Sequence, residues 1–114
     1  MKIKPTKITF HSGFKIGRVD PRIFGGFLEH LGRAVYQGIY EPQSPLSDTD
    51  GFRADVLKSL ARLKMTAMRY PGGNFASGYH WRDGVGAPDK RPTLPDLAWN
   101  SEETNQFGTD EFIR

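Results

Sequence analysis

Arg69-Tyr-Pro-Gly-Gly-Asn-Phe75 follows directly on a short apolar run that begins at Met65. The residues from Met65 to Tyr70 predict a buried strand, which the Pro-Gly-Gly sequence ends abruptly. Arg69 then lies at the carboxyl end of the strand and Asn74 on the loop beyond it, where α/β proteins usually place their ligand contacts. Pro-Gly-Gly also ends strands that bind nothing, so the heptapeptide alone is equally consistent with a plain turn.

A helix and an earlier strand precede this segment. The run from Ile23 to Leu31 is mostly apolar and contains two adjacent glycines, which is typical of a strand buried on both faces. Between Asp50 and Lys64 the apolar residues recur at helical spacing and predict a helix. A strand–helix–strand unit is expected to be parallel and right-handed, and to belong to a larger α/β sheet or barrel. The residues of the helical stripe are Phe52, Val56, Leu57, Leu60 and Leu63.

The two ends of the chain predict different structures. Polar and apolar residues alternate from Lys2 to Phe10 and from Phe14 to Val19, which predicts two strands of a hairpin-like element. The residues 71–100 have no periodicity and predict a long loop. The last six residues predict the start of a helix that Thr109 caps. Two strands and one finished helix cannot cover both faces of a sheet, so we expect the chain to be the opening part of a larger fold.

Composition narrows the classes of function. The 114 residues contain no cysteine, which excludes disulfides, thiolate metal sites and a cysteine nucleophile. His11, His30 and His80 lack metal-ligand spacing, so we expect neither a metal nor a cofactor. The net charge of +3 is mild and the basic residues are scattered, which disfavours a nucleic-acid partner. No apolar run has the length of a membrane span or of a signal peptide, so we expect a cytoplasmic protein without membrane contact.

Glu29 and the aromatic residues of the long loop are the candidate binding groups. Burying an unpaired carboxylate is unfavourable, so Glu29 within its apolar run needs hydrogen-bond donors or a functional partner. A solvated strand end is the alternative. Aromatic side chains suit the apolar C–H faces of sugar rings, and Glu, Asn and Arg suit their hydroxyls. Simple packing of Trp81 and Trp99 is the alternative, and no two carboxylates are arranged as an acid/base couple.

Several long motifs follow one another along nearly the whole chain. They are Ile23-Phe-Gly-Gly-Phe-Leu-Glu-His-Leu-Gly-Arg-Ala-Val-Tyr36, Gly38-Ile-Tyr-Glu-Pro42, Asp50-Gly-Phe-Arg53, the heptapeptide that ends at Phe75, Ser77-Gly-Tyr79, Trp81-Arg-Asp-Gly-Val-Gly86, Asp96-Leu-Ala-Trp99 and Glu103-Thr-Asn-Gln-Phe-Gly108. Together they resemble glycoside hydrolase family 51, the alpha-L-arabinofuranosidases. Gln37 and the stretch Thr93–Pro95 depart from the family's pattern.

The resemblance implies an α/β fold, a (β/α)8 barrel joined to an all-β sandwich. Residues 1–19 would supply strands to the sandwich, and residues 20–114 would form the first part of the catalytic barrel. The first barrel strand would be about Ile23–Leu28, the first helix about Gly51–Leu63 and the second strand about Thr66–Tyr70.

The resemblance also implies a reaction. Family members remove terminal alpha-L-arabinofuranosyl groups by a retaining mechanism, in which one carboxyl is the nucleophile and another the acid/base. Both carboxyls lie on later strands, beyond residue 114, so the resemblance places no catalytic residue in this chain. It assigns substrate binding to Glu29 and Asn74, a place in the floor of the site to Arg69, and a place at its rim to Trp99.

The leading hypothesis is the amino-terminal part of an intracellular alpha-L-arabinofuranosidase that binds arabinofuranosyl oligosaccharides. We expect a homo-oligomer at full length, or a complementary chain that carries the rest of the barrel. One alternative is a non-catalytic module for sugar binding or assembly. Another is a related glycosidase that acts on xylosides or glucans.

Overall fold

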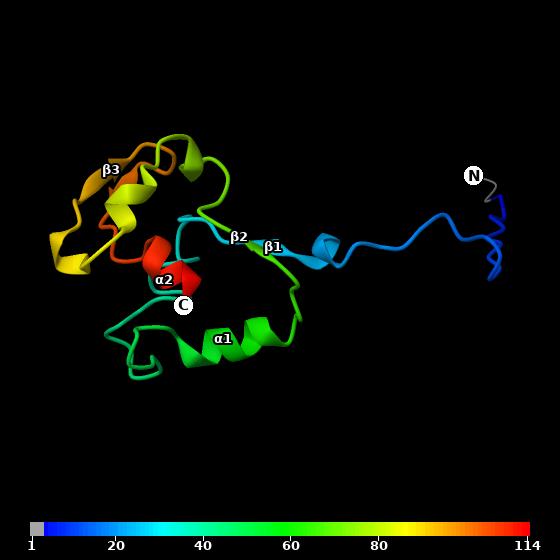
Figure 1. Ribbon diagram of the computed structural model, residues 1–114, viewed down its shortest axis with the longest axis horizontal. Helices are drawn as coiled ribbons and strands as arrows, with labels where there is room; N and C mark the ends of the chain where they lie inside the picture. Colours follow the sequence, from blue (N-terminus) through cyan, green and yellow to red (C-terminus); the bar gives the residue numbers. More distant parts are fainter. Residues whose placement is uncertain (1–3) are drawn as a thin grey trace.

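Two small sheets and two helices make up most of the regular structure in the computed structural model, which describes residues 4–114 (Figure 1). Strands β1 and β2 form a parallel pair, and strands β3 and β4 form an antiparallel pair. Short 3₁₀ helices connect these elements. In chain order the elements are η1 (Pro21–Phe24), β1 (Gly26–Phe27), α1 (Ala54–Ala61), β2 (Met68–Arg69), η2 (Phe75–Ser77), η3 (Trp81–Gly84), η4 (Pro88–Lys90), β3 (Leu94–Asp96), β4 (Ser101–Glu103) and α2 (Thr109–Ile113).

The predicted strand–helix–strand unit is confirmed. Gly26 pairs with Met68 and Phe27 with Arg69 in parallel register, and α1 lies between the two strands in sequence. The predicted lengths and burial of the strands were wrong, because each strand has two residues and the side chain of Phe27 is 60% exposed. Because β1 and β2 have no further strand beside them, few of their residues pair and both faces of the sheet stay open to water.

Helix α1 is shorter than the predicted span from Asp50 to Lys64. Asp48 explains its late start, since the Asp48 carboxylate accepts hydrogen bonds from the backbone N–H groups of Asp50 and Phe52 and holds them in a turn. Side-chain bonds of this kind compete with the helical backbone pattern. At the other end Lys64 has a positive φ of 51°, which is incompatible with a continuing helix.

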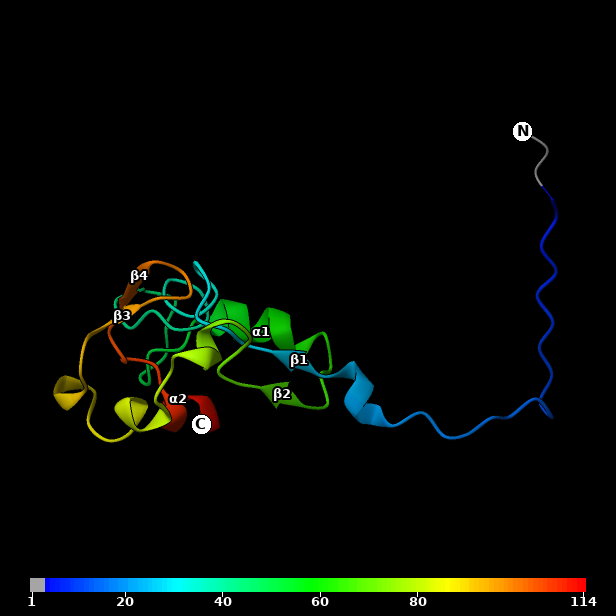
Figure 2. The ribbon, with the colours of Figure 1, turned by 90° about the horizontal axis from the view of Figure 1, so that it is seen from above.

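The predicted amino-terminal hairpin is not formed among the described residues. Residues 4–20 contain no strand and form an arm that leads away from the rest of the chain (Figures 1 and 2). Phe10 is 90% exposed and Ile8, Phe14 and Ile16 are exposed as well. An isolated hairpin is marginal in water without a partner surface for its apolar side chains, and residues 21–114 supply none to this arm. Lys2 and Ile3, where the prediction began, lie outside the described residues.

The end of the segment predicted as a loop forms the first strand of a hairpin. Strands β3 and β4 pair from Leu94 with Glu103 to Asp96 with Ser101, and Figure 2 shows them side by side. The Asp96 carboxylate closes the turn by accepting hydrogen bonds from Ala98 N at 2.9 Å and Ser101 Oγ at 3.3 Å. Both strands have three residues, too few to produce an alternating pattern.

An aromatic core joins the two ends of the folded part. Val35, Tyr40 and Phe107 are buried together, and the rings of Tyr40 and Phe107 are 5.5 Å apart, edge to face. Helix α2 begins at Thr109 as predicted, but the predicted cap was wrong. Gly108 is the N-cap residue, and its N–H donates to the Glu111 carboxylate at 2.8 Å. The partly buried residues around this core are Leu28, Tyr36, Ile39, Phe52, Tyr70 and Phe112.

Residues 1–114 in isolation should not form a cooperatively folded monomer. The radius of gyration is 19.9 Å, whereas a compact domain of about 100 residues has about 13 Å. The buried apolar side chains of the described part are Val35, Tyr40, Phe75 and Phe107, a small core for so many ordered residues. Thermal unfolding followed by circular dichroism should give a broad transition. A sharp two-state transition of a species that sediments as a monomer would contradict this expectation.

Candidate functional site

Glu29 lies just beyond the carboxyl end of β1, and the loop that follows β2 folds directly over it. The N–H of Phe75 donates a hydrogen bond of 2.9 Å to Glu29 Oε1. Gly72 has a φ of +119°, and a Cβ atom there would lie 2.3 Å from the Cβ atom of Glu29. Only glycine fits both this backbone conformation and this approach. The Pro-Gly-Gly sequence therefore brings the loop onto the predicted carboxylate, and does more than end a strand.

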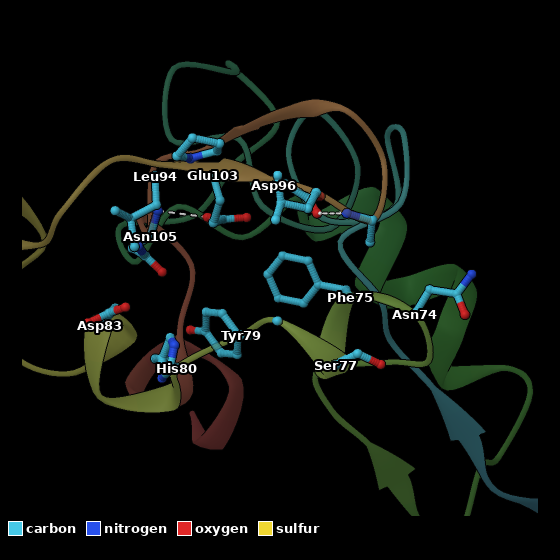
Figure 3. Close-up of a pocket in the computed structure, with 14 residues that line it drawn as sticks. Asn74, Phe75, Ser77, Tyr79, His80, Asp83, Leu94, Asp96, Glu103 and Asn105 are labelled. Atoms are coloured by element: carbon cyan, nitrogen blue, oxygen red, sulfur yellow. Dashed lines mark hydrogen bonds between the residues drawn. The ribbon is translucent and has the colours of Figure 1, made fainter.

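Asn74 belongs to this loop and immediately precedes η2. Its side chain is exposed, and its backbone carbonyl oxygen accepts a hydrogen bond of 3.2 Å from the backbone N–H of Ser77. In Figure 3 the Asn74 amide points away from Tyr79 and His80. The structure thus brings two of the predicted residues to one place, because the neighbour of Asn74 is the hydrogen-bond donor to Glu29.

Arg69 and Trp99 are not joined to Glu29 or Asn74 by any hydrogen bond within residues 4–114. The Arg69 guanidinium lies 4.9 Å from the ring centroid of Phe27, on the open part of the small parallel sheet. Trp99 lies in the turn that connects β3 to β4 and is half-buried. Its indole nitrogen is buried and has no hydrogen-bond partner in the described part of the chain. Their predicted roles in substrate binding stay predictions.

A pocket of about 370 Å³ opens beside Asn74 (Figure 3). Residues 74, 75, 77–80 and 83 line one side, and residues 94–98 with Glu103 and Asn105 line the other. Asn105 Oδ1 and Tyr79 Oη are buried and have no hydrogen-bond partner in the described residues. The lining also carries the polar side chains of Asn74, Ser77 and Asp83, which can bind hydroxyl groups.

A buried polar network that the sequence did not predict lies beneath Glu29. His30 Nδ1 is 2.7 Å from Glu103 Oε2, and both side chains are almost fully buried. His30 Nε2 is 3.0 Å from the hydroxyl of Tyr70, and Tyr36 donates a short hydrogen bond to Glu103 Oε1. The N–H of Asn105 donates to the same Glu103 oxygen at 2.6 Å. Four chain segments therefore meet at the contact between His30 and Glu103.

The electrostatics of this network keep Glu103 ionised. Burial raises the pKa of the Glu103 carboxyl, but the hydrogen bonds from His30 and Tyr36 outweigh burial and leave the pKa below its ordinary value. Burial raises the pKa of the Tyr36 and Tyr70 hydroxyls well above their ordinary value, with a smaller contribution from hydrogen bonding. Glu103 is therefore a fixed anion and is not arranged to donate a proton.

A second buried ion pair holds α2 against the preceding loop. Arg91 contacts Glu111 with both terminal nitrogens, at 2.7 Å and 3.0 Å. The Arg91 guanidinium also donates to the carbonyl oxygens of Gly86 and Asn105. Sequence reasoning missed both pairs, because their partners stand 73 and 20 positions apart in the sequence and no local pattern links them.

The described part of the chain shows two further negative findings. No group of three or more His, Asp or Glu side chains within residues 4–114 is arranged to hold a metal ion. None of the helices in this range is both long enough and apolar enough to cross a membrane.

Known proteins match the chain in sequence. The family described as "Alpha-L-arabinofuranosidase 1 domain" matches residues 59–114. Alpha-L-arabinofuranosidase C of Emericella nidulans is 56% identical over 94% of this chain. The intracellular exo-alpha-(1->5)-L-arabinofuranosidase 1 of Bacillus subtilis is 53% identical over 97% of it. The chain spans 21% and 22% of these two relatives, about a fifth of their length.

Solved structures match the fold as well. The family 51 alpha-L-arabinofuranosidase of Bifidobacterium longum superposes on 84% of this chain with a TM-score of 0.81 and 56% identity. The thermostable GH51 enzyme of Thermotoga petrophila covers 81% with a TM-score of 0.78 and 62% identity. The chain covers 19% of each of these structures. By sequence and by structure, the chain belongs to glycoside hydrolase family 51, as the counterpart of the amino-terminal portion of its alpha-L-arabinofuranosidases.

Proposed function

We propose that this chain supplies hydroxyl-binding groups to a retaining alpha-L-arabinofuranosidase. One observation carries the proposal: the Phe75 N–H fixes Glu29 Oε1, while Oε2 accepts no hydrogen bond from residues 4–114. A Cβ atom built on Gly73, the neighbour of Asn74, would lie 3.5 Å from this free oxygen. A carboxylate held at one oxygen and open at the other, beside an exposed amide, suits neighbouring hydroxyls of a sugar.

The chemistry itself would come from other residues. A retaining glycosidase needs two carboxyl groups about 5–5.5 Å apart, one of them free to exchange a proton. Glu103 is committed to His30, and Asp96 to the turn of its hairpin. Neither carboxylate is available for that work. As the resemblance to the family implies, the nucleophile and the acid/base would lie beyond residue 114, and this chain would orient the sugar for them.

The parallel strands β1 and β2, with α1 between them in sequence, support a proposal for the fold of the complete protein. Residues 20–114 would open a (β/α)8 barrel, and residues 1–19 would add strands to an all-β sandwich. The open faces of β1 and β2 support the first part, since parallel sheets are normally covered on both faces. The exposed alternating side chains of the arm support the second part.

The substrate would be a terminal arabinofuranosyl group of an oligosaccharide or polysaccharide. The relatives' names support arabinose over xylose or glucose. The name of the Bacillus subtilis relative supports a cytoplasmic location. A homo-oligomer, or a complementary chain, would cover the apolar surface that residues 4–114 leave open.

The roles of Glu29 and Asn74 can be tested by kinetics on the complete natural protein that contains residues 1–114, called the complete protein below. Losing a hydrogen bond to a charged group costs about 1.5–3 kcal/mol, and losing one to a neutral amide about 0.5–1.5 kcal/mol. Glu29→Ala should therefore lower kcat/KM roughly tenfold more than Asn74→Ala. The measurement is hydrolysis of a nitrophenyl arabinofuranoside by variants with unchanged melting temperature. A wild-type kcat/KM in folded Glu29→Ala would refute the assignment.

A further inference from the structure

We propose that His30 and Glu103 form a positioning pair, which fixes the carboxylate of Glu29 by holding the ring of Phe75. This inference rests on the proposed function, in which Glu29 binds the sugar. It adds two residues that do not touch the sugar themselves. It also assigns a role to β4, whose last residue is Glu103.

The first step is the single anchor of Glu29. Among residues 4–114, the Phe75 N–H is the hydrogen-bond donor to its carboxylate. Any shift of the Phe75 backbone must therefore move or release Glu29 Oε1. Since the geometry of a hydroxyl contact tolerates only small displacements, the position of Phe75 sets the quality of the sugar site.

The second step links Phe75 to His30. The Phe75 side chain is 5% exposed, and its ring stacks on the imidazole of His30 with centroids 4.4 Å apart and planes 16° apart. Glu29 and His30 are neighbours in sequence, so one residue holds the backbone of Phe75 and the next holds its ring. The orientation of the imidazole thereby determines where Phe75 can lie.

The third step is that each nitrogen of His30 has a close polar neighbour. Glu103 Oε2 lies 2.7 Å from Nδ1, and the Tyr70 hydroxyl lies 3.0 Å from Nε2. Rotation of the imidazole would break the hydrogen bond to Tyr70 and separate Nδ1 from the Glu103 carboxylate. Glu103 is fixed in turn by the hydroxyl of Tyr36 and the N–H of Asn105. Glu103 of β4 thus restricts the ring of His30, His30 restricts Phe75, and Phe75 restricts the carboxylate of Glu29.

A purely structural ion pair would behave differently from a positioning pair. A structural pair affects the fraction of folded protein, and its loss would scale activity by the same factor whether or not Glu29 is present. A positioning pair acts through Glu29, so its loss should matter only while Glu29 is there. A double-mutant cycle separates the two, because residues that act through each other give non-additive effects.

The cycle uses the complete protein with Glu103→Gln, Glu29→Ala and both changes together. Glu103→Gln should lower kcat/KM about tenfold in the wild-type background and less than about threefold in the Glu29→Ala background. Hydrolysis of a nitrophenyl arabinofuranoside is measured below the melting temperature of every variant. Equal factors in the two backgrounds, or no loss from Glu103→Gln, would overturn the proposal.

Two further variants keep the test decisive. Glu111→Gln alters the other buried ion pair, which has no contact with Phe75 or His30, and it should leave kcat/KM of the folded enzyme within about twofold. His30→Asn can still donate to Glu103 but loses the ring that stacks on Phe75, so it should reproduce the loss. It replaces Glu103→Gln if that variant does not fold. A wild-type complete protein without arabinofuranosidase activity would instead overturn the proposed function.

Discussion

Residues 1–114 on their own should release no nitrophenol from a nitrophenyl alpha-L-arabinofuranoside above the uncatalysed background. Retaining hydrolysis needs a nucleophile and an acid/base, whose joint action supplies most of the rate. The buried acids of the described part already have partners: Glu103 contacts His30, Glu111 pairs with Arg91, and Asp96 accepts hydrogen bonds in the turn of its hairpin. Binding groups without these two carboxyls can orient a sugar but cannot break its glycosidic bond.

The assay compares residues 1–114 with the complete protein at equal molar concentration. The complete protein should turn over the substrate, and the segment should not. Adding the segment to a polypeptide that carries the rest of the sequence should restore activity if the two parts associate. Turnover by the segment comparable to that of the complete protein would show that its own carboxylates can do the chemistry.

The elements that could be predicted from sequence are those that local patterns specify. The apolar stripe of α1 has helical spacing, and the Pro-Gly-Gly sequence marks the end of β2. The exact start of α1 could not be predicted, because a side-chain bond from Asp48 decides it. The hairpin β3–β4 could not be predicted either, since each strand has three residues and the Asp96 carboxylate closes its turn.

Some features of the candidate site also follow from local patterns in the sequence, and others do not. The apolar run around Glu29 predicts that its carboxylate needs a partner, and the N–H of Phe75 is one. The roles of Glu29 and Asn74 in sugar binding stay predictions. The partners of Glu103 and Arg91 could not be predicted. Glu103 lies 73 positions after His30, as its residue number shows, and no local pattern links positions that far apart. Only the folded chain brings these charges together.

Arg91→Met should produce the largest loss of stability of any single substitution considered. The Arg91 side chain is 2% exposed and that of Glu111 is 6% exposed, so the substitution leaves a carboxylate buried without its cation. It also removes the donors to Gly86 O and Asn105 O. Removing one partner of a buried ion pair typically lowers the free energy of unfolding by about 3–5 kcal/mol. Denaturant unfolding of the complete protein measures the loss.

Two controls test the cause of that loss. The double variant Arg91→Met, Glu111→Leu should recover part of the stability, because replacing both partners by apolar groups leaves no unpaired charge. Arg22→Met removes an exposed ion pair with Asp20, in which the Arg22 side chain is 81% exposed, and it should leave the unfolding curve unchanged. If Arg91→Met unfolds like the wild type, the pair does not hold α2 in place. The carboxyl group of Glu111 must then reach water or bind a proton in the folded protein, because a buried anion without its cation would destabilise it.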